Sequence, residues 1–177
     1  MRLLRSLAFT VFALPYALAA SQNQPPPAAV LPAVTAYALD RAKITLPADF
    51  RAPLNLLILS FQRNQQPEVD GWLGALPSGG PTVQVWLLPI SARANGLYRW
   101  WLNASLRTSL PPSQPRRYTV PLYVDKAHFL RAVQVSSERE VVLLLTDKTG
   151  HVLWRTTGPV SDSKKAALSG FLSRMGR

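Results

Sequence analysis

Two apolar runs of strand length stand out in the pattern of hydrophobic and polar positions along the chain. One covers residues 54–61, between Pro53 and five polar residues, and the other covers residues 141–145. An apolar run of this length is typical of a strand that is buried on both faces of a sheet. Each run therefore predicts a buried strand.

A helix is predicted directly after the first run. Pro67 suits the first helical position, and Val69, Leu73 and Leu76 recur at the spacing of one helical face. Residues 77–81 consist of proline, serine and glycine and predict the end of this helix.

The middle of the chain continues the alternation of strands and helices. Residues 82–90 predict a strand and residues 97–110 a helix. In residues 118–124 every second residue is apolar, which predicts a further strand. Asp125 then suits the N-cap of a short helix that runs to Val133.

The last part of the chain predicts a hairpin and a C-terminal helix. Asp147 and Gly150 occupy the first and fourth positions of a type I turn, which joins the second apolar run to a strand over residues 151–155. Ser161 is the expected N-cap of the last helix. The residues expected on its inward face are Leu168, Phe171, Leu172 and Met175.

Together these elements predict a three-layer α/β fold with a central β-sheet and flanking helices. The terminal hairpin makes that sheet mixed. A small additional strand is expected in front of the others, around residues 36–42.

The first 34 residues have a different pattern. Residues 1–20 place Arg2 and Arg5 before an apolar stretch that ends in small residues, which is the order of a secretory signal peptide. The stretch is short for a spanning helix, although an uncleaved anchor is the alternative. Residues 21–34 are rich in proline and predict an extended spacer. The folded domain is therefore expected over residues 35–177, in a protein exported to the periplasm or the extracellular space.

The composition and net charge of the chain exclude several kinds of functional site. The chain has no cysteine, which excludes disulfides, thiol catalysis and cysteine-based zinc sites. Its histidines, His128 and His151, stand far apart without a carboxylate cluster, so we expect neither a metal nor another cofactor. The net charge of +11 falls to +9 when the two arginines of the signal are removed. The expected partner is an envelope protein or an anionic membrane surface, and export argues against nucleic acid.

The C-terminal pattern resembles the thioredoxin-like superfamily, particularly its peroxiredoxin-type and exported TlpA-type branches. The order in that superfamily is a strand, an Asp-x-x-Gly turn, a strand, a glycine and a helix. Residues 142–155, with Asp147 and Gly150 in the turn, match this order and are followed by Gly158 and the last helix. The resemblance covers roughly residues 35–177 and implies a thioredoxin-like fold.

The same resemblance implies where a redox site would lie. The superfamily places Cys-x-x-Cys after the strand predicted over residues 54–61, where this chain has the sequence QRNQQ at residues 62–66. It also places a cis-proline before the hairpin strand, where this chain has Glu140 or Val141. Both halves of the redox site are therefore missing, and we expect a redox-inactive domain.

A shorter resemblance concerns the cysteine-poor mitochondrial assembly factors for the membrane sector of ATP synthase. Residues 145–154 match their Leu-x-Asp-x-x-Gly-x-x-x-Trp hairpin, and Gln66, Val69 and Trp72 resemble part of their first helix. Because the N-terminal signal differs from a mitochondrial presequence, this likeness implies an assembly role only by analogy.

One group of candidate binding residues follows the first apolar run. Arg63, Gln65 and Gln66 lie at a predicted helix N-terminus, where free backbone N–H groups suit an anion or a peptide carbonyl. The alternative is a solvated loop whose polar side chains cap the helix.

A second group lies on the predicted helix over residues 97–110. Arg99, Trp100 and Arg107 combine cationic and aromatic side chains that suit contact with a protein or a membrane surface. The alternative is that Trp100 packs under the proline-rich residues 111–115.

These observations predict an exported, redox-inactive thioredoxin-like binding protein, an accessory or assembly factor for envelope proteins. One alternative is an enzyme with a non-thiol site in the same cleft, for example a hydrolase built on Asp125 or Asp147. Another is a structural envelope protein held by its basic surface. Binding predicts an exposed patch near Arg63 or Trp100, whereas an enzyme requires a concave pocket with two convergent titratable groups.

Overall fold

The centre of the molecule is a mixed five-stranded β-sheet. The computed structural model describes residues 29–76, 82–92 and 116–175. The strands of the sheet are β3 (Leu54–Ser60), β4 (Val83–Ala92), β5 (Leu122–Val124), β6 (Val142–Asp147) and β7 (Val152–Thr157). They lie in the order β5-β4-β3-β6-β7, with β3, β4 and β5 parallel and with β6 antiparallel to both β3 and β7.

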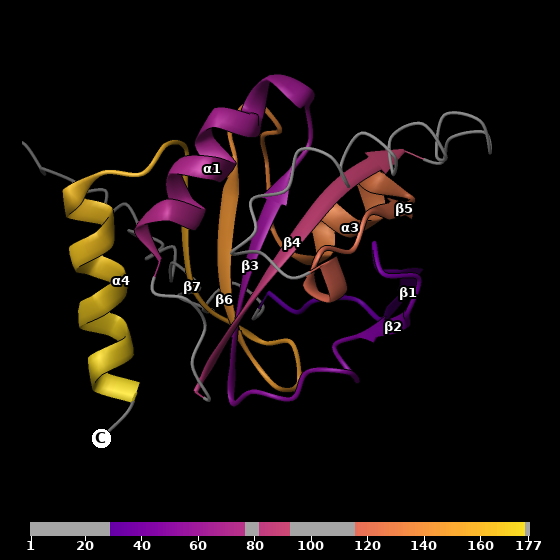
Figure 1. Ribbon diagram of the computed structural model, residues 1–177, viewed down its shortest axis with the longest axis horizontal. Helices are drawn as coiled ribbons and strands as arrows, with labels where there is room; N and C mark the ends of the chain where they lie inside the picture. Colours follow the sequence, from indigo (N-terminus) through magenta and orange to yellow (C-terminus); the bar gives the residue numbers. More distant parts are fainter. Residues whose placement is uncertain (1–28, 77–81, 93–115, 176–177) are drawn as a thin grey trace, which may run out of the picture.

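Helices cover both faces of this sheet, which confirms the predicted three-layer α/β fold (Figure 1). One face carries α1 (Gln66–Ala75) and α4 (Asp162–Met175), and the other carries α3 (Lys126–Ala132). A small antiparallel hairpin of β1 (Val34–Tyr37) and β2 (Lys43–Leu46) lies on the α3 side. Two short 3-10 turns, η1 (Arg63–Gln65) and η2 (Arg116–Tyr118), precede α1 and β5.

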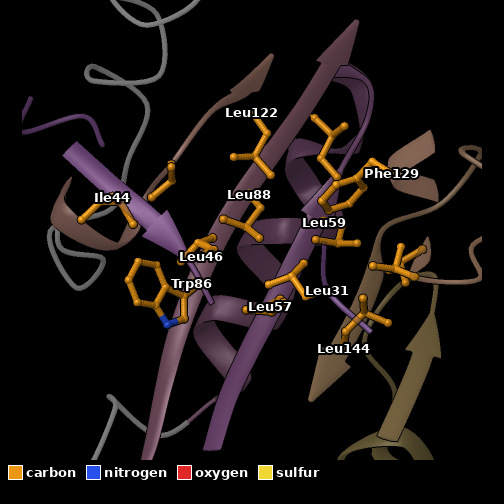
Figure 2. Close-up of a cluster of buried hydrophobic side chains, with 14 of the residues drawn as sticks. Leu31, Ile44, Leu46, Leu57, Leu59, Trp86, Leu88, Leu122, Phe129 and Leu144 are labelled. Carbon is orange, nitrogen blue, oxygen red and sulfur yellow. The ribbon is translucent and has the colours of Figure 1, made fainter. Parts of the chain in front are cut away.

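Alternate residues of β3 enter two separate cores, which explains why most of this strand is apolar on both faces. Leu57 and Leu59 pack on the α3 side with Trp86 of β4 and Phe129 of α3 (Figure 2). The residues that alternate with them, such as Ile58, pack on the opposite side. That second core contains Val69 and Trp72 of α1, Leu168 of α4 and alternate residues of β6. The predicted buried strands over the two apolar runs are confirmed.

Asn55 is the polar exception inside β3, and its amide group is fully used. Its Nδ2 donates to the carbonyl of Ala52 at 3.1 Å, and its Oδ1 accepts from Trp86 Nε1 at 3.0 Å. Because a buried polar group costs stability only when it lacks a partner, this pair fixes the Trp86 ring at little cost. The ring also contacts Phe50 and Tyr118, with ring centroids 5.5 and 5.0 Å away.

Residues ahead of the predicted boundary at residue 35 pack into the folded domain. Ala29 and Leu31 are buried, and Val30 forms an antiparallel bridge with His151 at the start of β7. The Val152 N–H donates to the Ala29 carbonyl at 2.9 Å. These residues were assigned to the spacer and belong to the domain instead. The predicted signal peptide and the rest of the spacer lie outside the described residues.

Two predicted strands are wrong in extent. The strand expected over residues 118–124 is reduced to β5, because η2 ends at Tyr118 and because Pro121 has no N–H to offer to a ladder. The small strand expected around residues 36–42 is present as β1, but it ends at Tyr37, and residues 38–42 form the turn to β2, where Arg41 has a φ of 74°.

The predicted turn between β6 and β7 and the predicted N-cap of α4 are confirmed. Asp147 and Gly150 close the β6–β7 turn, and the Gly150 N–H donates to the Asp147 carbonyl at 3.2 Å. Ser161 caps α4 by accepting from the Lys164 N–H at 3.3 Å. Met175, which is expected on the inward face, is instead 50% exposed at the last position of α4. Within the described residues, no helix has the length and apolar character needed to cross a membrane.

Candidate binding site

The loop between β3 and α1 is closed by the side chain of Gln65. This side chain is only 2% exposed. Its Oε1 accepts from the N–H groups of Phe61 at 2.7 Å and Gln62 at 3.1 Å, and its Nε2 donates to the Glu138 carbonyl at 2.8 Å. Gln65 therefore joins the loop to the segment that precedes β6, and its amide group is occupied by the protein itself.

A second contact ties the same two segments together. Glu68, in the first turn of α1, accepts from the Val141 N–H at 3.2 Å. Val141 is one of the two residues, with Glu140, at the position where the thioredoxin-like resemblance implies a cis-proline, and a proline would have no N–H to donate. The N–H of Val141 is satisfied by the Glu68 carboxylate.

The other candidate residues of this loop remain at the surface. Gln66 donates from Nε2 to the Asp70 carboxylate at 2.8 Å, one turn further along α1, and Arg63 is exposed at the start of η1. Gln65 itself is buried, and its side chain accepts from the backbone at the start of η1 and makes no cap on α1. The second candidate group, Arg99, Trp100 and Arg107, lies outside the described residues and stays a prediction.

A cavity of about 250 Å³ opens beside the segment that joins α3 to β6. The strands β6 and β7 form its other wall. The residues that line it include Val135, Ser136, Ser137, Glu140, Val142 and Arg155. None of them could be recognised as a site residue from the sequence, because they are spread over three segments and no short motif connects them.

A basic surface that the sequence analysis also missed lies at the β1–β2 hairpin. We call it the hairpin patch, and it consists of Tyr37, Arg41, Lys43, Arg116 and Arg117, all exposed. Two backbone contacts bring them together: Tyr37 and Lys43 are partners across β1 and β2, and the Leu39 N–H donates to the Arg116 carbonyl at 3.2 Å. The adjacent Arg116 and Arg117 are the signal that could have indicated this surface.

The two aspartates of the enzyme alternative do not converge. Asp125 caps α3 at the carboxyl end of the parallel strands, where it accepts from the His128 N–H at 3.0 Å. Asp147 is paired with Leu54, the first residue of β3, at the opposite end of the sheet. A site built on both is therefore ruled out by their positions.

Asp147 serves the turn instead. Its carboxylate accepts from the Thr149 hydroxyl at 2.7 Å and from the N–H groups of Thr149 and His151 at 2.8 and 3.0 Å. Partial burial raises the pKa of Asp147, but these hydrogen bonds outweigh it and hold the pKa below its usual value. A carboxylate with a lowered pKa is a weaker general base at neutral pH. No group of three or more His, Asp or Glu side chains within the described ranges is arranged to hold a metal ion.

Several solved structures have this arrangement of strands and helices. An exposed lipoprotein thioredoxin (Etrx1) from Streptococcus pneumoniae superposes with a TM-score of 0.55 at 11% identity, over 81% of this chain and 99% of that one. A putative electron transfer protein from Aquifex aeolicus gives 0.56 at 9% identity, over 80% and 94% of the two chains. BsSco, a member of the Sco family of cytochrome c oxidase assembly proteins, gives 0.53 at 10% identity, over 82% and 94%.

The fold is thioredoxin-like. No protein-family model matches the chain, and no curated protein matches it either. The likeness to the mitochondrial ATP synthase assembly factors is not shown by these comparisons. In the thioredoxin-like frame, the Gln65 loop occupies the place of the thiol pair, and the chain has no cysteine to put there.

We expect the purified protein to show no disulfide reductase and no thiol peroxidase activity. Both reactions require a sulfur nucleophile, and the thiolate of cysteine is the one that the thioredoxin-like site activates. Turnover of insulin disulfides and of hydrogen peroxide should equal that of the heat-denatured protein. A rate above that control, retained on further purification, would contradict the prediction.

Proposed function

We propose that this chain is an exported, redox-inactive thioredoxin-like protein that works by binding, as an accessory or assembly factor for envelope proteins. The observation that carries the proposal is the closed loop at the start of α1. Gln65 and Glu68 fill hydrogen-bonding positions around it with the protein's own groups. These contacts between the protein's own groups, together with the absence of cysteine, support a domain that does not act by thiol exchange.

The proposed location rests on the signal-like residues 1–20 and on analogy with a structural neighbour. Etrx1 is an exposed lipoprotein. The proposed assembly role likewise draws on BsSco, which belongs to a family of assembly proteins. At about 10% identity both likenesses support the fold, and the role is carried over by analogy.

The charge of the surface supports an acidic partner. All nine acidic residues of the chain lie within the described ranges, and several of them are engaged in caps or ion pairs. No ion pair among the described residues involves the four cations of the hairpin patch. Asp40, the acidic residue within the same turn, accepts from the Ala42 N–H at 2.9 Å. The patch therefore carries an excess of positive charge beside an exposed tyrosine, a combination suited to a protein contact.

We expect residues 21–177, carrying an affinity tag, to retain an envelope protein from a membrane extract at 0.15 M salt. The double substitution Arg116→Gln/Arg117→Gln should reduce that retention roughly tenfold, because it removes two cations from the contact. The matched control is Arg131→Gln/Arg139→Gln, which removes the same charge from exposed positions outside the patch. The control should bind like the unmodified protein.

Binding to anionic vesicles over a series of salt concentrations tests the alternative partner, an anionic membrane surface. The Debye length falls from about 30 Å at 0.01 M salt to about 8 Å at 0.15 M, so attraction by charge alone should be lost over this range. Salt-sensitive binding to vesicles, with no protein retained from the extract, would replace the envelope protein by a membrane surface. Retention that is unaffected by either double substitution would move the contact away from the hairpin patch, and Arg63→Ala and Trp100→Ala would then test the sequence-based candidates.

A further inference from the structure

We infer that the cavity beside β7 is a binding site for a small zwitterion, a free α-amino acid or a dipeptide. Two groups of opposite charge line it, the guanidinium of Arg155 and the carboxylate of Glu140. Neither belongs to the closed loop at the start of α1 or to the hairpin patch. The site is independent of the proposed partner contact and is lined by the segment that joins α3 to β6 and by residues of β6 and β7.

The guanidinium of Arg155 is held in place by the backbone. Its Nη1 donates to the Gln134 carbonyl at 2.8 Å, which fixes one corner of the planar group. A guanidinium has five N–H donors, so this contact leaves donors for a ligand. Two parallel donors are the arrangement that binds a carboxylate in bidentate fashion.

The carboxylate of Glu140 is positioned by a glycine. A Cβ built on Gly158 would lie 3.2 Å from Cδ and from both carboxylate oxygens of Glu140. Gly158 has a φ of 76°, a conformation that suits glycine, so the chain has no side chain at the point where the carboxylate rests. The Glu140 carboxylate thus lies beside Gly158, directly after β7, in space that a side chain at this position would restrict.

The two charges do not neutralise each other. No ion pair involves Arg155 or Glu140 among those found between described residues. Both nevertheless line one cavity, together with the hydroxyl groups of Ser136 and Ser137 and the apolar side chains of Val135 and Val142. A ligand with a carboxylate and an ammonium group would pair with both charges, and the hydroxyls can donate to its carboxylate.

The volume sets the size of the ligand. At about 30 Å³ for each water molecule, a cavity of about 250 Å³ holds roughly eight waters. This is below the range of about 300–1,000 Å³ that is usual for sites of drug-sized ligands. An amino acid or a dipeptide such as diglycine fits this space, whereas a longer peptide could insert only one end.

The test is a titration followed by backbone amide chemical shifts of the protein. We expect glycine or diglycine to cause saturable shifts in residues 134–140 and 155–157. The single-charge analogues N-acetylglycine and glycinamide should each bind at least about tenfold more weakly than glycine, because each loses one charge-assisted contact. Arg155→Gln and Glu140→Gln should each weaken binding of the zwitterion to a similar extent.

Matched comparisons separate the site from a general effect of charge. Arg139→Gln removes one cation from the same segment at a residue that does not line the cavity, and it should leave binding unchanged. The Arg155→Gln variant should bind glycinamide and glycine equally, because it lacks the guanidinium that would bind the ligand's carboxylate. The inference is overturned if neither zwitterion causes saturable shifts at about 10 mM, tenfold above a millimolar Kd. Equal binding of the capped analogues to the unmodified protein would overturn it as well.

Discussion

Replacing Gln65 by alanine is expected to lower the free energy of unfolding by about 2 to 4 kcal/mol. The substitution removes the partner of two backbone N–H groups and of the Glu138 carbonyl. Each buried polar group that loses its partner costs about 1 to 3 kcal/mol, and water access at the exposed Gln62 reduces the total. Urea denaturation followed by tryptophan fluorescence measures the change.

The control for this prediction is the neighbouring Gln66→Ala. That side chain makes one contact with Asp70 on the surface of α1, and such pairs contribute about 0.2 to 0.5 kcal/mol. If both variants unfolded at the same urea concentration as the unmodified protein, Gln65 would not be the residue that closes the loop. Its role as a binding residue would then be open again.

Gly150→Ala is expected to destabilise the protein by about 2 to 3 kcal/mol. Gly150 has a φ of 90°, and a residue with a Cβ in the left-handed region costs about 1 to 2 kcal/mol. The new Cβ would also lie 3.1 Å from Pro47 Cγ and 3.2 Å from Leu31 Cβ, so the neighbours must shift. Thermal and urea unfolding both measure the loss.

The same substitution at Gly74 provides the contrast. Gly74 lies in α1, and a Cβ there meets no atom within 4 Å. Gly74→Ala should raise stability by about 0.5 to 1 kcal/mol, since alanine is the better helix former. Unchanged stability of Gly150→Ala would show that the turn tolerates a side chain and that its contacts with Leu31 and Pro47 are loose.

The elements that could be predicted are those whose signal is contained in a short stretch of sequence. The run that became β3 is apolar because both of its faces are buried, and the Asp147–Gly150 turn carries its own hydrogen-bonding groups. Where a long-range contact decides the outcome, the prediction failed. Ala29 and Leu31 follow a proline-rich stretch, and their role comes from pairing with Gly150 and Val152, far along the chain.

The candidate site shows the same division. Gln65 stands where the sequence placed it, at the start of a helix, but its function depends on the Glu138 carbonyl 73 residues away. Nothing in the local pattern distinguishes a glutamine that binds a ligand from one that binds its own backbone. The cavity is even less predictable, because Glu140 and Arg155 come to line the same space only when β6 and β7 pair in the sheet.

The bridge between Val30 and His151 has a consequence for how the domain is presented. The chain joins the domain at the end of the sheet where the β6–β7 turn lies, whereas the Gln65 loop and Glu140 lie at the other end. The seven residues of β3 span about 20 Å between these ends. A carrier or a solid support coupled directly ahead of Ala29 would therefore be attached at the end of the sheet opposite the Gln65 loop, which makes N-terminal immobilisation the suitable orientation for measuring binding at that loop.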